Sequence, residues 1–307
     1  MLLTALMAAS LLAQDAPSVS ACDAVRSAAL AAEGRQAAAA RTFEIASLRF
    51  QAAFEACPQN RALLLENSNT LLMAGRLADA RNMSNDILRL DPHNATALKI
   101  KGNAEYLLGQ FETASSAFIT LLEKHPEDDE GAYMLGRIYY QEGRIDQAIG
   151  QFQRVLKLKP GSYKAWDNLG LCWQARGETE KAIAHFLHAI QLVEDDHSEY
   201  DWAYANLADL LLQTGDTERA FAAAAKAANR NPNSARNFYI GAKALDRLGK
   251  TELCLNWLQR AASLNPAYAE PHYLLIRVYS RLGQSQEAEE ARNRFLEIKA
   301  KEPARRR

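Results

Sequence analysis

The sequence predicts an all-α solenoid of about eight helix-turn-helix repeats, on the strength of three regularities in its 307 residues. Glycines recur every 34 residues, with one step of 38, at Gly75, Gly109, Gly143, Gly177, Gly215, Gly249 and Gly283. Prolines follow them in phase at Pro58, Pro92, Pro126, Pro160, Pro232 and Pro266. Between these residues the apolar positions follow helical spacing rather than strand alternation. A fixed period of this length is typical of repeat architectures.

The repeat around Gly143 shows how each element is predicted. Leu135, Ile138 and Tyr139 stand at i, i+3 and i+4, which predicts an amphipathic first helix, and a second helix with the same spacing follows the glycine. Gly143 is expected to form the turn because glycine adopts positive φ at little cost. Pro160 is expected to end the second helix, since proline cannot continue one.

Small and large residues alternate in fixed columns of these repeats. Gly136 and Gly170 are expected to lie where a first helix meets its neighbours, with Phe152 and Phe186 filling the space beside them. One helix pair cannot bury its own apolar face, so the repeats are expected to stack.

These columns resemble the tetratricopeptide repeat family. Its W-x2-L-G-x2-Y opening and second-helix positions are matched by Trp166, Leu169, Gly170, Trp173 (in place of Tyr), Ala182, Phe186 and Ala189. The resemblance predicts units at 27–60, 61–94, 95–128, 129–162, 163–196, 201–234, 235–268 and 269–302. It implies a right-handed superhelix whose first helices line an inner groove that holds a peptide.

The two ends depart from the pattern. The first unit has Arg41 where the others have the turn glycine, and the last has Arg292 where others have an apolar residue. We expect both units to be caps that turn a polar face outward. Residues 14–26 form an N-terminal segment, and residues 303–307 form a basic tail.

Charge excludes some partners. The 36 Lys and Arg against 37 Asp and Glu leave a net charge of −1, so no global field favours nucleic acid or an anionic membrane. The apolar run within residues 1–13 is too short to span a bilayer and predicts a signal peptide, hence a periplasmic or secreted protein without a transmembrane span in its mature chain. The alternatives are a lipid anchor on Cys22, after a lipobox-like Val19-Ser20-Ala21, and a cytoplasmic protein.

The cysteines are placed by the repeat register. Cys22 precedes the first helix of unit one and Cys57 ends its second, so antiparallel packing brings the two close enough for a disulfide; two unpaired thiols are the alternative. Cys172 and Cys254 occupy helix positions and are expected to be small buried side chains.

Catalytic motifs are absent from the sequence, which predicts neither an enzyme nor a cofactor. His185 and His188, with His197 or Asp195, could suggest a metal site, but solvated helix surface is favoured. Trp166 and Trp173 are expected to pack in the core.

The resemblance places a set of polar and aromatic side chains on the inner surface. Seven residues of this set are not counted among the predicted partner-binding residues: Asn69, Lys99, Tyr133, Arg137, Lys164, Asp167 and Asp209. The predicted partner-binding residues are Asn103, Tyr106, Tyr140, Asn168, Trp202, Asn206, Arg236, Tyr239, Lys243, Arg247, Tyr273, Arg277 and Arg281. Asn168 and Asn206 fill one column and could form a two-rung amide ladder along a peptide backbone.

The C-terminal units supply the basic part of this set. Arg236, Lys243, Arg247, Arg277 and Arg281 outnumber Asp246 and Glu270 beside two tyrosines. Arg with Tyr is enriched in binding hot spots, and this cluster suits an acidic or C-terminal carboxylate segment.

The carboxylate clamp of some family members is only partly matched. Lys99, Asn103 and Lys164 fit its columns, but Met134 and Asn168 replace the required Asn and Arg. The clamp is therefore not favoured.

The longer glycine step places four extra residues at 197–200. They are either a tolerated loop insertion or a flexible joint between a five-unit and a three-unit block.

The sequence thus predicts a non-catalytic scaffold that binds an extended segment of a partner protein in its concave groove, in the bacterial cell envelope. A cytoplasmic adaptor or co-chaperone is the alternative, and an accessory subunit of an enzyme is a more distant one.

Overall fold

The computed structural model describes residues 22–194, 197 and 199–301, so the predicted signal peptide and basic tail lie outside the described residues. Over this part of the chain every regular element is a helix, and the sixteen helices form eight consecutive pairs. The predicted all-α repeat fold is confirmed. The chain divides into two compact units, residues 1–131 and 132–307.

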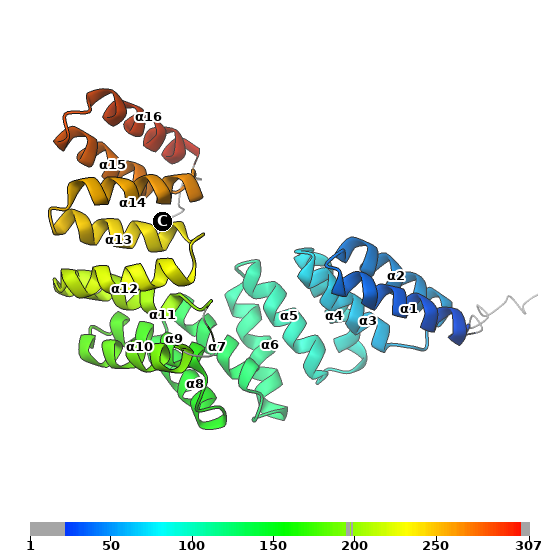
Figure 1. Cartoon of the computed structure of the whole chain (residues 1–307). Helices are drawn as coiled ribbons and strands as arrows, with labels where there is room; N and C mark the ends of the chain where they lie inside the picture. The colour runs from blue at the N-terminus through cyan, green and yellow to red at the C-terminus, as the bar shows by residue number, and fades with distance from the viewer. Residues whose placement is uncertain (1–21, 195–196, 198, 302–307) are drawn as a thin grey trace, which may run out of the picture. The chain divides into compact units, whose positions relative to one another are not determined.

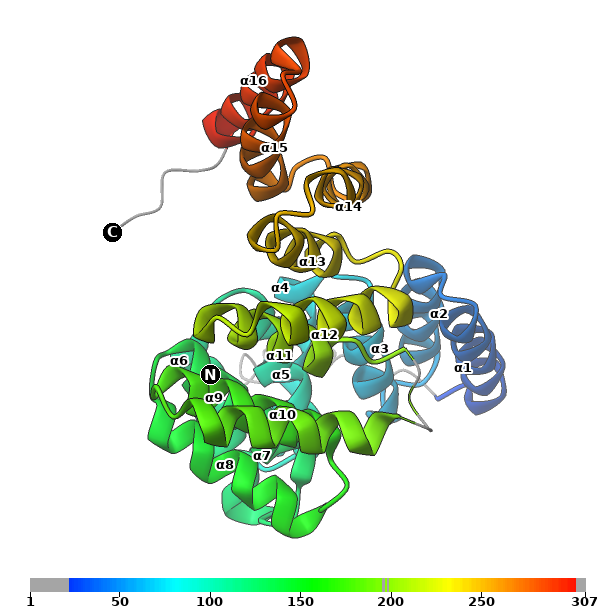
Figure 2. The ribbon, with the colours of Figure 1, turned by 60° about the vertical axis from the view of Figure 1, so that its left-hand side comes forward.

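Each unit is a stack of helices in which neighbours along the chain pack together (Figures 1 and 2). The first unit contains α1 (Ala24–Ala39), α2 (Phe43–Ala56), α3 (Ala62–Met73), α4 (Leu77–Leu90), α5 (Ala95–Leu107) and α6 (Phe111–Lys124). The second contains α7 (Asp129–Gln141, starting just before the boundary), α8 (Ile145–Leu158), α9 (Tyr163–Ala175), α10 (Thr179–Val193), α11 (Trp202–Thr214), α12 (Thr217–Arg230), α13 (Ala235–Arg247), α14 (Thr251–Leu264), α15 (Ala269–Arg281) and α16 (Ser285–Lys301). First helices of successive repeats also touch, as α11 and α13 do.

The turns between paired helices are closed by the predicted glycines. All seven have φ between 70° and 88°. After α7, the Gly143 N–H donates to the carbonyl of Tyr140 at 3.0 Å and the Arg144 N–H donates to that of Tyr139 at 2.8 Å. These bonds satisfy carbonyl groups that the helix end leaves without intrahelical partners.

The first repeat makes the same turn without glycine. Arg41 has φ of 58°, and the bonds from Arg41 N–H to the Ala38 carbonyl (3.0 Å) and from Thr42 N–H to the Ala37 carbonyl (2.9 Å) repeat the pattern. The first repeat therefore keeps the turn geometry although it lacks the glycine. Arg41 bears the steric cost that a side chain meets in the left-handed region.

Buried phenylalanines seat against glycines, as predicted. An added Cβ would lie 2.8 Å from the Phe152 ring at Gly136 and 2.4 Å from the Phe186 ring at Gly170. Both rings are fully buried. The glycines are thus needed for close approach rather than for backbone freedom.

Where the phenylalanine is missing, the facing residue changes with it. The same two columns hold Ser68 and Ser84, whose hydroxyl oxygens are 2.8 Å apart, and then Ala208 and Ala224, both completely buried. A large ring therefore faces a glycine, and a small side chain faces another small one, so that the two helices stay in contact.

The insertion at 197–200 does not separate two blocks. Residues on both sides lie in one compact unit. The Arg230 guanidinium donates to backbone carbonyls around the insertion, those of Val193 (3.1 Å), His197 (2.9 Å) and Glu194 (3.3 Å). The division of the chain into compact units therefore falls at residue 131 rather than at the insertion, and the flexible joint stays a prediction.

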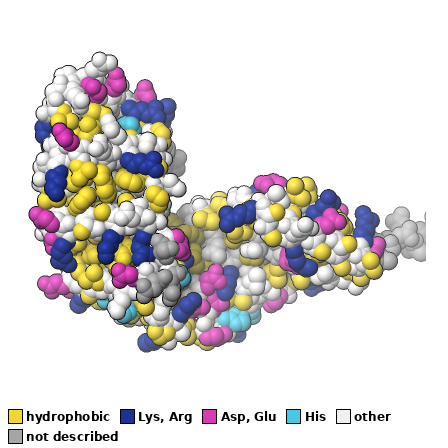
Figure 3. Space-filling model, viewed as in Figure 1, with side chains coloured by type: hydrophobic (Ala, Val, Ile, Leu, Met, Phe, Trp, Pro, Cys, Tyr) yellow, Lys and Arg dark blue, Asp and Glu magenta, His cyan; other side chains and the backbone are white. Residues whose placement is uncertain are grey.

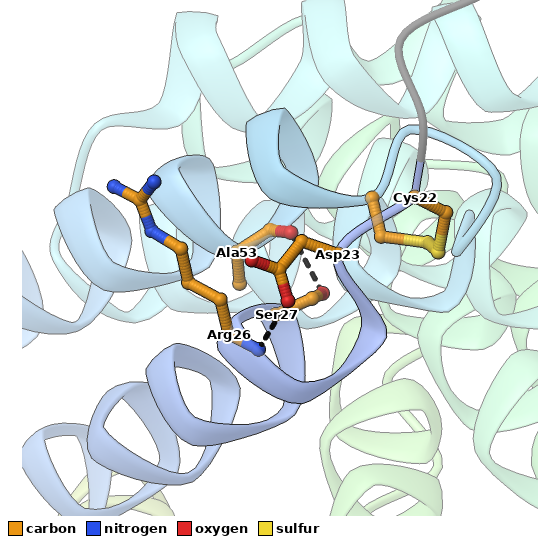
Figure 4. Close-up of a disulfide and its surroundings, with 6 residues drawn as sticks. Cys22, Asp23, Arg26, Ser27 and Ala53 are labelled. Atoms are coloured by element: carbon orange, nitrogen blue, oxygen red, sulfur yellow. Dashed lines mark hydrogen bonds between the residues drawn. A yellow bond between two sulfur atoms is a disulfide. The ribbon is translucent and has the colours of Figure 1, made fainter.

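The N-terminal helix is tied to the end of α2 at several points (Figure 4). Cys22 and Cys57 form a disulfide with their Cα atoms 4.2 Å apart. The Asp23 carboxylate accepts the Arg26 N–H at 2.9 Å, which caps α1, and the Ser27 hydroxyl donates to the Ala53 carbonyl at 2.7 Å.

The first repeat does not turn a wholly polar face outward. Val25 on α1 is 83% exposed, and Ile45 and Leu48 on α2 are 52% and 67% exposed. The prediction of a polar N-terminal cap is wrong for these positions. Arg292 in the last repeat is exposed, as predicted.

The other two cysteines are structural. Cys172 and Cys254 are completely buried, and burial raises the pKa of each thiol to about 12. Both therefore stay protonated at neutral pH and are poor nucleophiles.

Candidate functional site

The predicted partner-binding residues all lie on first helices or at their ends, and they divide between the two units. Asn103 and Tyr106 belong to α5 in the first unit. The second unit carries Tyr140 on α7, Asn168 on α9, Trp202 and Asn206 on α11, Arg236, Tyr239, Lys243 and Arg247 on α13, and Tyr273, Arg277 and Arg281 on α15.

The first unit has a hollow of about 370 Å³ beside Asn69, Lys99 and Asn103. The Lys99 ammonium pairs with Asp128 at 2.7 Å and Glu130 at 3.0 Å. Burial disfavours the charge of Lys99, but these two hydrogen bonds and ion pairs outweigh burial, and the pKa of the lysine is raised. Lys99 is thus already neutralised by two carboxylates, which argues against its use as a carboxylate clamp.

A larger hollow of about 540 Å³ lies in the second unit, and we call it the aromatic hollow. Its lining comes from α7, α9, the segment before α11, and α11: Tyr133, Arg137, Tyr140, Gln141, Lys164, Asp167, Asn168, Leu171, Tyr200, Trp202 and Asn206. Trp202 is 56% exposed.

A buried polar network underlies the aromatic hollow. Asp167, only 3% exposed, accepts hydrogen bonds from the Tyr200 hydroxyl (2.6 Å) and the Asn206 amide (2.9 Å). The Asn206 carbonyl oxygen in turn accepts from Arg236 at 3.0 Å. Burial raises the pKa of Asp167 even though these hydrogen bonds and Arg236 favour its charged form. Burial and the neighbouring Asp167 raise the pKa of Tyr200 as well.

The predicted asparagine ladder is not poised for a ligand. The Asn168 amide nitrogen donates to the Tyr133 hydroxyl at 3.1 Å and to the Lys164 carbonyl at 2.8 Å. Asn206 is 5% exposed and bonded on both its nitrogen and its oxygen. Their shared column brings the residues into one hollow, but their amides bind neighbouring side chains and backbone.

The second hollow of this unit, about 450 Å³, is lined by α13 and α15, and we call it the basic hollow. Its residues are Tyr239, Lys243, Asp246, Arg247, Tyr273, Leu274, Arg277 and Arg281. Arg277 and Arg281 both donate to the Asp246 carboxylate, Arg281 at 2.7 Å. The side chain of Asp246 is 8% exposed, whereas those of Arg277 and Arg281 are 59% and 43% exposed. A single buried carboxylate thus holds two exposed guanidinium groups side by side.

The other three basic residues have their own partners. Lys243 pairs with Asp209 at 3.2 Å, and Arg247 donates to the Leu212 carbonyl at the C-terminal end of α11. Arg236 binds Asn206 and lies 5.6 Å from the Trp202 ring. The predicted basic cluster is therefore assembled, and its two α15 arginines stay exposed while sharing one carboxylate.

Sequence reasoning counted Asp246 as an offsetting charge and missed its position between the two arginines. The position of Asp246 could have been predicted from the spacing of opposite charges along the sequence. Arg277 and Asp246 are 31 residues apart, and so are the ion-paired Lys99 and Glu130. A spacing slightly below the period joins facing turns of neighbouring first helices, so opposite charges at this spacing predict a cross-repeat pair. Tyr200, in the insertion, carries no such signal.

The histidines and tryptophans of the fifth repeat pack together between α9 and α10. The ring of Trp166 lies 4.2 Å from that of His188 and 5.4 Å from that of His185. Trp166 and Trp173 pack against the hydrophobic core as predicted, but both are only half-buried. Asp195 lies outside the described residues, and no cluster able to hold a metal ion occurs among those that the structure describes.

Charged side chains of both signs occur on the face of the second unit that Figure 3 shows. Apolar and basic side chains are interleaved over α12–α14 on the face shown in Figure 3. Among the described helices, none is both long enough and apolar enough to cross a bilayer.

Comparison with known proteins agrees with this architecture. Tetratricopeptide repeat family models match residues 65–118, 101–162 and 133–199, and residues 203–234, which together make up about half of the chain. No curated protein matches in sequence.

Solved structures share the fold at low identity. A tetratricopeptide repeat protein from Parabacteroides merdae has a TM-score of 0.66 and 22% identity over 78% of this chain and 94% of that one. A chain of the APC/C hetero-tetramer Cut9–Hcn1 has a TM-score of 0.63 and 16% identity, over 85% of this chain and 50% of the other. PilF of Pseudomonas aeruginosa has a TM-score of 0.59 and 18% identity, over 68% and 97%. From its family models and its fold, the chain belongs to the tetratricopeptide repeat family of protein–protein interaction scaffolds.

Proposed function

We propose that this protein is a non-catalytic scaffold that holds an extended, acidic segment of a partner protein along the first helices of residues 132–301. Both hollows of this unit are lined mainly by first helices, from α7 to α15. Extended concave surfaces of this kind are what stacked repeats use for binding.

One observation carries the proposal: Arg277 and Arg281 remain largely exposed although both are pinned by the buried Asp246. A guanidinium group has five N–H donors, and the bonds to Asp246 leave most of them for a ligand. Pairing with a carboxylate in this position is favourable because charge-assisted hydrogen bonds are stronger than neutral ones. Tyr239 and Tyr273 stand beside the arginines and add the aromatic surface that binding sites favour.

The surface is also ordered before a ligand arrives. Arg236 and Lys243 are held by Asn206 and Asp209, and Arg247 is held by the end of α11. Less side-chain entropy is then lost on binding than on a surface of free side chains.

We also propose that the protein acts in the cell envelope. The short apolar run in residues 1–13 supports export. The Cys22–Cys57 bond supports it too, because disulfides persist in oxidising compartments and are rare in the cytosol. Mass spectrometry of the purified mature protein tests this: a first residue between Gln14 and Ala21 is expected, and an intact Met1 would contradict it.

Neutralising the two arginines of α15 is expected to weaken binding of an acidic ligand. The variant Asp246→Asn/Arg277→Gln/Arg281→Gln removes the arginines without leaving the Asp246 carboxylate buried and unpaired. We expect a labelled oligoglutamate peptide to bind at least about tenfold more weakly, since charge-assisted hydrogen bonds contribute roughly 1.5–3 kcal/mol each. Fluorescence anisotropy at low salt measures the affinity.

Arg292→Gln is the matched control, because Arg292 on α16 is 59% exposed, like Arg277, and lies outside both hollows. Circular dichroism is expected to be the same for all three proteins. Equal binding by the triple variant and the wild type would show that the basic hollow is not the site.

A further inference from the structure

We propose, on the basis of the function proposed above, that the partner segment carries two recognition elements. One is an apolar, preferably aromatic side chain that enters the aromatic hollow, and the other is an acidic residue that enters the basic hollow. The two lie about seven residues apart in an extended chain. The proposal rests on the different chemistry of the two hollows and on their separation within one compact unit.

The aromatic hollow favours an apolar side chain because the hydroxyl groups of two of its tyrosines are already engaged. The hydroxyl of Tyr200 donates to Asp167, and that of Tyr133 accepts from Asn168. What these tyrosines have left to offer is ring surface, which continues in Tyr140 and in the half-exposed Trp202. Offset or edge-to-face ring contacts would add to the burial of an aromatic ligand side chain.

A cationic ligand side chain fits this hollow poorly. The Asp167 carboxylate that would attract it is 3% exposed and bonded to Tyr200 and Asn206. Arg137 and Lys164 line the same hollow and would repel another positive charge. Lys164 is better suited to donate to a backbone carbonyl of the ligand.

The basic hollow has the opposite character. Its exposed groups include the guanidinium groups of Arg277 and Arg281, set side by side by Asp246. Two adjacent guanidinium groups suit a carboxylate ligand, because a carboxylate accepts bidentate hydrogen bonds. Because Asp246 is buried, it positions the arginines while their outer donors stay accessible.

The surface between the hollows offers little side-chain selectivity. It is formed by α11 and α13, where Asp209 is paired with Lys243 and Arg236 is bonded to Asn206. Asp209 and Lys243 neutralise one another, and the Arg236 guanidinium is engaged by the Asn206 amide. The stretch of ligand between its two recognition elements is therefore expected to tolerate sequence changes.

The geometry of the repeats sets the length of this stretch. The aromatic hollow is centred on α9 and the basic hollow lies between α13 and α15, which is two to three first-helix spacings further on. Packed helices lie about 8–10 Å apart, so the separation is about 20–25 Å. An extended chain covers about 3.3 Å per residue, and the gap therefore takes about seven residues.

Synthetic peptides test this directly. Each carries one tryptophan and one Glu-Glu pair, joined by a Gly-Ser spacer of about two, seven or fourteen residues, of which only the last two can span the separation estimated above. We expect the peptide with the seven-residue spacer to bind at least about tenfold more tightly than that with the two-residue spacer, because joining two sites raises the effective concentration at the second. The longest spacer is expected to lie between them.

Two variants assign the hollows. Trp202→Ala and Asp246→Asn/Arg277→Gln/Arg281→Gln should each remove the advantage of the seven-residue spacer. Leu296→Ala is the control for the first, since Leu296 on α16 is 55% exposed against 56% for Trp202. Arg292→Gln is the control for the second, and neither control should change the affinity.

The outcomes separate this inference from the function on which it rests. Binding that depends on Arg277 and Arg281 but not on spacer length or Trp202 would overturn the two-element ligand and leave the acidic groove intact. Binding of every peptide that is insensitive to the triple variant would overturn the proposed function itself.

Discussion

Gly170→Leu is expected to lower the free energy of unfolding by about 2–3 kcal/mol, the larger part of the range for overpacking a core. Even a Cβ at this position would lie 2.4 Å from the Phe186 ring, which is completely buried and cannot swing into solvent. Either the ring or the helix pair α9–α10 must shift. Urea unfolding followed by circular dichroism measures the loss.

Gly150→Leu is the matched control. Gly150 also lies within a helix, α8, but an added Cβ there meets nothing within 4 Å. Removing a glycine from an exposed helix interior should stabilise the protein by about 0.5–1 kcal/mol. Opposite signs for the two substitutions are therefore expected, and a loss of similar size for both would show that the Gly170–Phe186 contact has no special weight.

Removing the disulfide is expected to destabilise the N-terminal repeat by about 2–4 kcal/mol, the usual range for a bridge that closes a loop of this order. Cys22 and Cys57 are 35 residues apart and hold α1 to the end of α2. Cys22→Ala/Cys57→Ala avoids placing a hydroxyl at Cys57, which is 6% exposed. Hydrogen exchange of the α1 and α2 amides should quicken, while that of α13 and α14 should not change.

Dithiothreitol provides the internal control for this prediction. It should bring the wild type to the exchange rates of the double variant and leave the variant unaffected. Cys172 and Cys254 should not contribute, because both are completely buried. Wild-type protection of α1 that is the same with and without reductant would contradict a stabilising bridge.

The repeat fold could be predicted from the sequence because a few residue types each serve one structural role in every repeat. Gly143 and its six counterparts stand where the chain needs positive φ, and all of them show it. Gly170 and Phe186 predict each other, since a ring of that size fits only where the facing helix has no side chain. Arg41 shows the limit of this logic, because the turn forms there without its glycine.

The binding surface could be predicted only as a set of columns. Repeat register places Asn206 and Asn168 on first helices correctly, but it does not say that Asp167 and Arg236 use up the Asn206 amide. Such partners come from neighbouring repeats about one period away and depend on side-chain geometry. The same holds for Asp246. From the sequence it only reduces the net positive charge of the cluster, but in the structure it is buried between Arg277 and Arg281 and positions both.

The break between compact units was not predictable in this way. The insertion at 197–200 is the visible irregularity of the sequence, yet Arg230 bridges it. The division at residue 131 falls in a stretch where the period of 34 is unbroken.

Site-specific photo-crosslinking tests the central claim most directly, namely that a partner lies along the first helices of residues 132–301. Benzoylphenylalanine is placed either at Tyr273, a first-helix residue of the basic hollow that is 63% exposed, or at Leu187, a second-helix residue on α10 that is 44% exposed. With envelope extract, a discrete crosslinked partner is expected from position 273, weakened by an excess of oligoglutamate, and none from position 187. Crosslinking from position 187 with position 273 silent would place the partner on the second helices and contradict the account.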